Sequence, residues 1–117
     1  MPVEKQDNVT DIFEKIRLRC TKDLQAEEAS KILVVLSSLY GTLIDVSIDS
    51  QMEYNRKYEE FSDKLEKITE ARAKAKASPE YEDLLRWEAK VSVCKELINS
   101  LKYLLKVKLD EKNESKY

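Results

Sequence analysis

Lys76-Ala77-Ser78-Pro79-Glu80-Tyr81-Glu82-Asp83 is the stretch that decides the fold, because it contains the clearest break in the chain. Proline suits the first position of an α-helix, serine caps a helix start, and acidic residues stabilise the first turn through the helix dipole. Ser78 is therefore the predicted cap, and Pro79 the predicted first residue, of a helix. Apolar stripes lie on both sides, so residues 77–79 predict a tight turn between two antiparallel helices.

The segment after this turn has the spacing of an amphipathic helix. Its apolar residues recur three and four positions apart, which places them on one helical face. The pattern fades after Asp110, where charged residues take over. The stripe consists of Leu84, Trp87, Val91, Cys94, Ile98, Leu101 and Leu105.

The segment before the turn predicts a longer helix, from Leu24 to about Lys76. Gly41 lies within it and costs about 1 kcal/mol relative to alanine, which does not by itself end a helix. The weakest part is residues 45–50, which are polar and β-branched, so a kink or break is expected there if anywhere. The core stripe consists of Ala29, Ile32, Leu36, Leu39, Leu43 and Val46, in the alternating spacing of a coiled coil.

The two ends of the chain lack this periodicity. Residues 1–9 are expected to form a flexible N-terminal tail, and residues 112–117 a flexible C-terminal tail. Thr10 is the predicted cap of a short first helix, and Thr21 or Asp23 of the next. Residues 10–111 are then a single helical domain with its hairpin turn at 77–79.

Composition supports an all-α, coiled-coil-like fold. Charged residues make up 38% of the 117 residues and apolar residues 42%, while the strong helix breakers are Gly41, Pro2 and Pro79. The longest apolar run, residues 32–36, is far shorter than the ~20 residues of a membrane span. The first residues lack the apolar core of a signal peptide, and Cys20 and Cys94 fit reduced thiols. We therefore expect no membrane partner and a cytoplasmic location, in a host cell if the protein is viral.

The helix lengths predict self-association. The last helix, ~50 Å long, covers only the later part of a second helix approaching ~80 Å. The apolar face from Ile32 to Ile48 is then left exposed except for the short first helix, and such a patch is large for a monomer. The expected homo-oligomer would associate through Ile32, Leu36, Leu39, Leu43 and Val46, together with Ile98, Leu101 and Leu105.

The residues that most enzymes need are missing from the sequence. It contains no histidine, no CxxC pair, and too little glycine for a phosphate-binding loop. Carboxylates such as Glu59, Glu60 and Asp63 stand among lysines at helical spacing, which is typical of surface ion pairs. We therefore expect a protein that is not an enzyme and that binds no metal or cofactor.

Basic residues are clustered, although the formal net charge is −2. Clustered cations bind polyanions even near neutrality, and single-stranded nucleic acid prefers cationic grooves with aromatic stacking platforms. The simpler interpretation is that these clusters are solvated helix faces. Tyr54, Tyr58 and Trp87 fall on the core stripes and are expected to pack inside. The candidate nucleic-acid contacts are Lys64, Lys67, Arg72, Lys74 and Lys76 before the turn, and Lys102, Tyr103 and Lys106 after it.

Two short segments carry a family resemblance. The opening Asp11-Ile12-Phe13-Glu14-Lys15-Ile16 and the helix entry Asp23-Leu24-Gln25-Ala26-Glu27-Glu28-Ala29, followed by a terminal helix from Trp87 to Leu109, resemble the T-even phage recombination mediator family (UvsY-like). The resemblance is diffuse and spans residues 9–111. It implies an oligomer that binds single-stranded DNA and helps a RecA-like recombinase displace single-strand-binding protein. The chain is shorter than that family and lacks its glycine-rich loop, which puts the placement of the DNA-contacting segment in doubt.

Two classes of function remain open. The first is a single-stranded-DNA-binding accessory protein, as the basic clusters and the resemblance suggest. The second is a helical protein-binding module of a phage, such as a defence inhibitor, a chaperone or a virion assembly factor, with no nucleic-acid role. The balanced overall charge favours the second class, and both classes need long helices and self-association.

Overall fold

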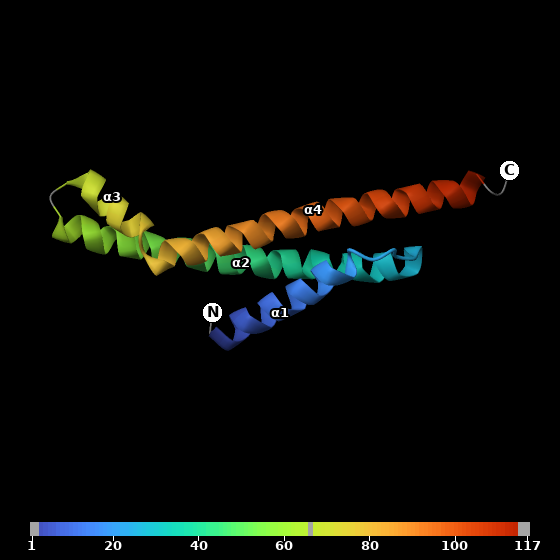
Figure 1. Cartoon of the computed structure of the whole chain (residues 1–117), viewed down its shortest axis with the longest axis horizontal. Coiled ribbons are helices and arrows are strands. Elements are labelled where there is room, and N and C mark those ends of the chain that lie inside the picture. Colours follow the sequence, from blue (N-terminus) through green and yellow to red (C-terminus); the bar gives the residue numbers. More distant parts are fainter. Residues whose placement is uncertain (1–2, 66, 115–117) are drawn as a thin grey trace.

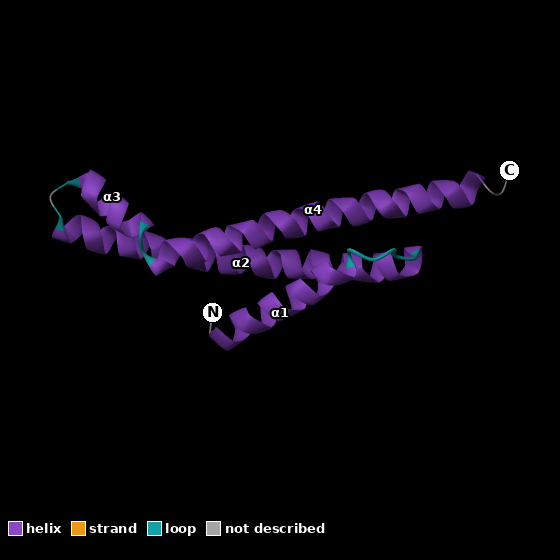
Figure 2. Cartoon of the chain, in the orientation of Figure 1, coloured by secondary structure: helices purple, strands orange, loops and turns teal. Residues whose placement is uncertain are grey.

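The computed structural model, which describes residues 3–65 and 67–114, is all-helical over that part of the chain, as expected (Figure 2). It forms an elongated body measuring 73 × 28 × 19 Å. Helix α1 is followed by a long helix α2, a short α3 and a long α4 (Figure 1). Their bounds are Val3–Arg19 for α1, Ala26–Lys64 for α2, Ile68–Lys76 for α3 and Pro79–Glu114 for α4.

The core lies where α2 packs along α4 and α1 packs against α2. Alternating three- and four-residue spacing directs the core stripe of α2 toward α4 and α1, and all six of its members are buried. Trp87 of α4 is buried in the same cluster, as expected for a core residue. The largest fully buried side chains are Phe13, Leu36, Leu43, Val46 and Cys94.

The chain reverses direction after α2, and the predicted reversal at residues 77–79 is wrong. Helix α2 ends at Lys64, and Leu65 and Lys67 both have extended backbone dihedrals. Helix α3 then runs back along the end of α2, and α4 continues in roughly the same direction (Figure 1). Ala77 and Ser78 therefore form a short junction between α3 and α4.

The prediction of one continuous helix to Lys76 is wrong for the same reason. The segment 45–50, expected to be its weakest part, is uninterrupted helix. Neither glycine nor proline stands at residues 65–67, so no local signal marks the break. Folding back instead buries Ala71 and Ala75 of α3 completely, and their small side chains allow a close approach to α2.

The break also removes the premise on which self-association was predicted. It shortens α2 to 39 residues, while α4 has 36, so the two helices are nearly equal in length. Leu36, Leu43 and Val46 are completely buried within one chain, and Leu105 packs against the same core. The remaining predicted association residues, Ile32, Leu39, Ile98 and Leu101, are buried there as well.

Three predicted helix ends also need correction. Helix α1 begins at Val3, so residues 3–9 are helical where a flexible tail was expected, and Val9 is buried. Helix α2 begins at Ala26 after Gln25, whose side chain makes no capping hydrogen bond. Helix α4 continues to Glu114, past the expected start of the C-terminal tail at residue 112. Residues 1–2 and 115–117 of the expected tails lie outside the described residues.

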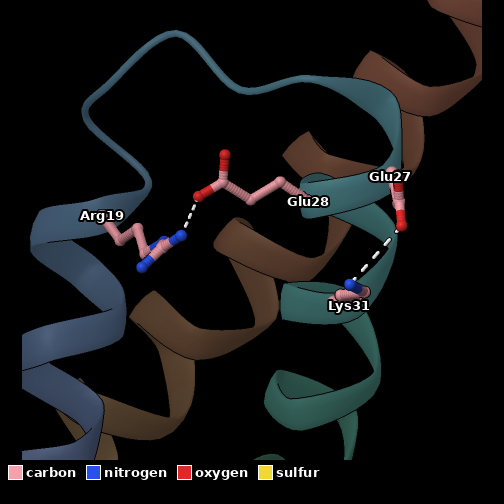
Figure 3. Close-up of polar contacts among 4 residues, drawn as sticks. All are labelled: Arg19, Glu27, Glu28 and Lys31. Carbon is pink, nitrogen blue, oxygen red and sulfur yellow. Dashed lines mark hydrogen bonds and ion pairs between the residues drawn. The ribbon is translucent and has the colours of Figure 1, made fainter.

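The connection between α1 and α2 is tied by an ion pair. The guanidinium of Arg19, at the end of α1, contacts the carboxylate of Glu28 in the first turn of α2 (Figure 3). Glu27 points to the other side and pairs with Lys31, at 3.5 Å. Leu24 in the connecting loop is buried, which anchors the loop on the core.

Helix α2 is more apolar overall than its longest apolar run indicated. By length and composition alone it is apolar enough to cross a membrane, and only 22% of its most apolar 18-residue window is buried. Core helices of soluble proteins meet the same criterion. The apolar surplus of α2 therefore lies partly on the surface of this chain.

Candidate nucleic-acid interface

A surface hollow of about 460 Å³ lies between the end of α2 and α3, beside their packed contact. It is lined by Tyr54, Asn55, Tyr58, Arg72 and Lys76, and we call it the α2–α3 hollow. None of its five lining residues is acidic. It combines two cations with two aromatic rings, which is the combination that single-stranded nucleic acid requires.

Helical spacing positions both sides of the hollow. Tyr54 and Tyr58 lie four residues apart on α2, and Arg72 and Lys76 lie four residues apart on α3. Residues at this spacing share one helical face, so each helix presents such a pair to the hollow, and α2 adds Asn55. Because α3 folds back after Leu65, the two pairs face each other although they are well separated in the sequence.

The adjoining face of α3 holds it in place. Ala71 and Ala75 are fully buried, while Arg72 and Lys76 remain exposed. At the junction with α4, the buried Ser78 hydroxyl donates a hydrogen bond to the Ala75 carbonyl oxygen, at 2.5 Å. The predicted cap residue therefore secures the end of α3 beside the hollow.

The two tyrosines differ in their surroundings. The ring of Tyr54 packs against that of Tyr81 in α4, with centroids 5.2 Å apart and planes tilted by 44°. Tyr54 is therefore partly a packing residue, as its place on the stripe suggested. Tyr58 lies one turn further along α2, is half-buried, and is the better platform for a base.

The cations of the hollow keep their charge available for a ligand. Among the residues that the structure describes, no ion pair engages Arg72 or Lys76. By contrast, Arg19 in the N-terminal basic stretch is paired with Glu28, and the hollow beside it also contains Asp23. The hollow between α2 and α3 is therefore the stronger candidate for an anion.

The other predicted contact residues do not join this hollow. Lys74 lies on α3 between Arg72 and Lys76 but is absent from the lining, and Lys64 and Lys67 flank the break. Lys102, Tyr103 and Lys106 are exposed on the later part of α4, at the opposite end of the long axis from α3 (Figure 1). Tyr103 is 70% exposed. The two predicted clusters therefore form two separate surfaces.

Sequence reasoning missed Asn55 and the role of the two tyrosines. In a continuous helix, Tyr58 and Arg72 would lie about 20 Å apart along the axis, so nothing indicated that they meet. The one signal that could have suggested them is the matched four-residue spacing of the aromatic pair and the cationic pair.

The acidic and cysteine side chains of the described residues do not form a second candidate site. Within residues 3–65 and 67–114, no group of three or more acidic or cysteine side chains is arranged to hold a metal ion. Cys20 is a half-buried free thiol and Cys94 a buried one. Burial raises the pKa of both thiols, that of Cys94 to about 11, which disfavours the reactive thiolate.

Comparison with family profiles, with curated proteins and with solved structures finds no match for this chain. The resemblance to the T-even recombination mediators therefore stays a prediction.

Proposed function

We propose that the protein is a single-stranded-DNA-binding accessory protein that uses the α2–α3 hollow as its contact surface. The observation that carries this proposal is the presence of two tyrosines and two exposed cations around one hollow. A base would stack on the Tyr58 ring, and the guanidinium of Arg72 and the ammonium of Lys76 would bind the adjacent phosphates. The Asn55 amide offers both a donor and an acceptor to a base edge.

The expected affinity of one chain is low. Two cations neutralise few phosphates, which gives weak binding with a shallow salt dependence and without sequence preference. Several copies on one strand would make later contacts intramolecular and raise the overall affinity by ~10²–10⁴ where the geometry allows. The proposed functional form is therefore a homo-oligomer.

The proposed partners are a RecA-like recombinase and a single-strand-binding protein. This part of the proposal is supported by the resemblance to the T-even mediator family, through residues 11–16 and 23–29. In that role the protein would hold single-stranded DNA while the recombinase replaces the single-strand-binding protein. Loading of a recombinase onto covered DNA, with and without this protein, tests that role separately from DNA binding.

Fluorescence anisotropy with a labelled oligothymidine at ~50 mM salt tests the DNA-binding proposal, since phosphate contacts are strong there. The Arg72→Glu/Lys76→Glu variant should lose most binding. Lys74→Glu/Lys67→Glu is the matched control, because it changes the same charge beside the hollow without touching its lining. Circular dichroism should show the same helix content in both. Equal losses in the two variants would contradict a contact at the hollow.

The second candidate, a helical protein-binding module, is favoured by a different observation. Helix α2 exposes several apolar side chains, including Val34, Ile48 and Met52. Failure of the wild-type chain to bind oligothymidine at low salt would make this candidate the better account.

A further inference from the structure

Helix α2 carries a second periodic face outside the core, bordered by α1 beside Val34 and Ser38 and by the start of α4 beside Met52. Its residues alternate four and three positions apart, the same spacing as the core stripe. Val34 is 71% exposed, Ile48 54% and Met52 59%, values that are high for apolar side chains at such regular positions. We call this set the outer face; it consists of Val34, Ser38, Gly41, Asp45, Ile48 and Met52.

The middle of the outer face admits another helix at short range. Gly41 is exposed, and a Cβ added there would meet nothing within 4 Å. Its neighbour on the face, Ser38, is also small. The two large apolar residues Val34 and Ile48 lie symmetrically around this point, because Gly41 stands midway between them in the sequence.

The charges of α2 show a complementary arrangement around the same point. Glu27 precedes Gly41 by nearly the same interval as Arg56 follows it. Lys31 and Asp49 form a second pair of opposite charges. They lie on either side of Gly41 at similar intervals and closer to it than the first pair. Glu27, Lys31 and Arg56 make their ion pairs within α2 on the surface, so they remain within reach of a partner.

We propose that two copies of the chain pair through this outer face, antiparallel, with Gly41 opposite Gly41 on a two-fold axis. In this register Val34 of one copy lies level with Ile48 of the other. Glu27 of one copy then lies at nearly the same height along the helix pair as Arg56 of the other. Lys31 of one copy likewise lies close to the height of Asp49 of the other. The interface is isologous, as a two-fold axis requires.

The charges disfavour the other arrangements. A parallel pair in register would set Asp45 beside Asp45 and Lys31 beside Lys31, and like charges facing each other are destabilising. A bilayer would have to accommodate Asp45 in the middle of the same face, which is costly in hydrocarbon. In the antiparallel pair the two Asp45 side chains lie at different levels, each beside the small Ser37 and Ser38 of the second copy.

This pairing places the two α2–α3 hollows far apart. Tyr54 and Tyr58 lie about four helical turns beyond Gly41, so the hollows of the two copies are roughly 45 Å from each other at a rise of about 1.5 Å per residue. One strand of DNA could then contact both. The pairing itself rests on the outer face alone and stands whether or not the hollow binds DNA.

Light scattering after size-exclusion chromatography tests the stoichiometry. The wild-type chain should give twice its 13.7 kDa mass at tens of micromolar. The Val34→Lys/Ile48→Lys variant should give the monomer mass with unchanged helix content, since both side chains are exposed. Leu85→Lys is the matched control, because Leu85 is an exposed apolar residue on α4 and should leave the dimer intact. A wild-type monomer would overturn the proposal, and so would a dimer that survives the double lysine change.

Disulfide trapping tests the orientation, in a Cys20→Ser background with Cys94 left buried. Gly41→Cys should cross-link to itself across the two-fold axis. A mixture of Val34→Cys and Ile48→Cys chains should give the mixed dimer, and each alone should stay reduced. Self-cross-linking of Val34→Cys would mean a parallel pair and overturn the proposed register. Anionic vesicles provide a further test. If the chain co-sediments with them and no longer forms the dimer in their presence, the pairing is overturned and the face binds a lipid surface.

Oligothymidine binding separates this inference from the proposed function. Loss of the dimer in Val34→Lys/Ile48→Lys should lower the apparent affinity at least ten-fold if both hollows act on one strand, as expected for lost multivalency. A dimer without DNA binding refutes the function and leaves the pairing. DNA binding by a wild-type monomer refutes the pairing and leaves the DNA-binding role of the hollow.

Discussion

The thiol of Cys94 in α4 donates a hydrogen bond to the backbone carbonyl oxygen of Leu36 in α2, with the sulfur and oxygen 3.7 Å apart. Both residues are completely buried, so this contact lies at the centre of the α2–α4 packing. The thiol is a small apolar group with one weak donor, and the carbonyl provides the acceptor it needs in the core. The contact places Leu36, in the apolar stripe of α2, directly against α4 of the same chain.

The two cysteines should differ sharply in reactivity. Burial raises the pKa of the Cys94 thiol to about 11, and the side chain has no exposed surface. The pKa of Cys20 is also raised, but this residue is only half-buried at the end of α1. Iodoacetamide at pH 8 should therefore modify Cys20 first and Cys94 only in denaturant, as followed by intact mass. Equal rates in the folded protein would contradict the packing described for α4.

Stability should fall at alkaline pH because of the same thiol. Below pH 9 the Cys94 thiol is protonated in both states, so it adds no pH dependence. Between pH 9 and about 11 the unfolded chain releases this proton while the folded chain retains it, which lowers the free energy of unfolding. The loss should reach roughly 1–3 kcal/mol, since one pKa unit corresponds to about 1.4 kcal/mol. Urea unfolding of wild type and Cys94→Ser isolates the effect, because only the difference between their pH profiles reports this group.

Neighbouring positions on α2 should respond very differently to truncation. Leu36→Ala should lower the free energy of unfolding by about 2–5 kcal/mol, because it leaves a cavity between α2 and α4. In the dissociated monomer, Val34→Ala should change it by less than about 0.5 kcal/mol, as is usual for surface positions. The sequence placed Leu36 in an association surface, where Leu36→Asp would weaken only the oligomer; in this fold the same change should unfold the chain. Chemical denaturation of Leu36→Ala and Val34→Ala distinguishes a Leu36 buried within one chain from a Leu36 in an association surface. Similar losses in the free energy of unfolding would contradict the structure.

Gly41→Ala should stabilise the folded monomer. The glycine lies inside a helix, and an added methyl group meets nothing within 4 Å. The expected gain is about 1 kcal/mol, from the lower helix propensity of glycine. Because Gly41 lies at the centre of the proposed dimer, the measurement belongs in the Val34→Lys/Ile48→Lys background, where pairing is abolished. An unchanged or lower free energy of unfolding there would mean that the backbone at Gly41 is not helical.

The sequence predicted the helices and most of the core, because periodic spacing is a local property. Leu84, Trp87, Cys94 and the core stripe of α2 were assigned to the interior from spacing alone, and the structure buries them. The helix start at Pro79 is also where the residues indicated, whereas the hydroxyl of Ser78, the predicted cap of this helix, bonds back to Ala75 of α3. The all-helical class follows from the same patterns.

The chain reversal could not be predicted, because its cause is not local. Leu65 and Lys67 have no special backbone preference, and the break is favoured by burying Ala71 and Ala75, which lie several residues later. The sequence pattern placed the reversal at the end of α3 instead of the end of α2, and it therefore predicted an exposed apolar face on α2. It also hid the hollow, because Tyr58 and Arg72 meet only when α3 folds back.

Tyr58 should contribute to DNA binding through its ring and not through its hydroxyl. Stacking of a base on an aromatic side chain is worth about 1–3 kcal/mol, so Tyr58→Leu should weaken oligothymidine binding by at least about five-fold. Tyr58→Phe is the matched control and should bind nearly as well as wild type, because it keeps the ring.

The salt dependence should be shallow, since two cations on single-stranded DNA give a logarithmic slope near −1.4 per chain. Raising the salt from ~50 to ~200 mM should then weaken binding about seven-fold per hollow, and Lys76→Met should halve the slope while Tyr58→Leu leaves it unchanged. If Tyr58→Leu lowered the slope and Lys76→Met did not, the assignment of stacking to one residue and phosphate contact to the other would be wrong.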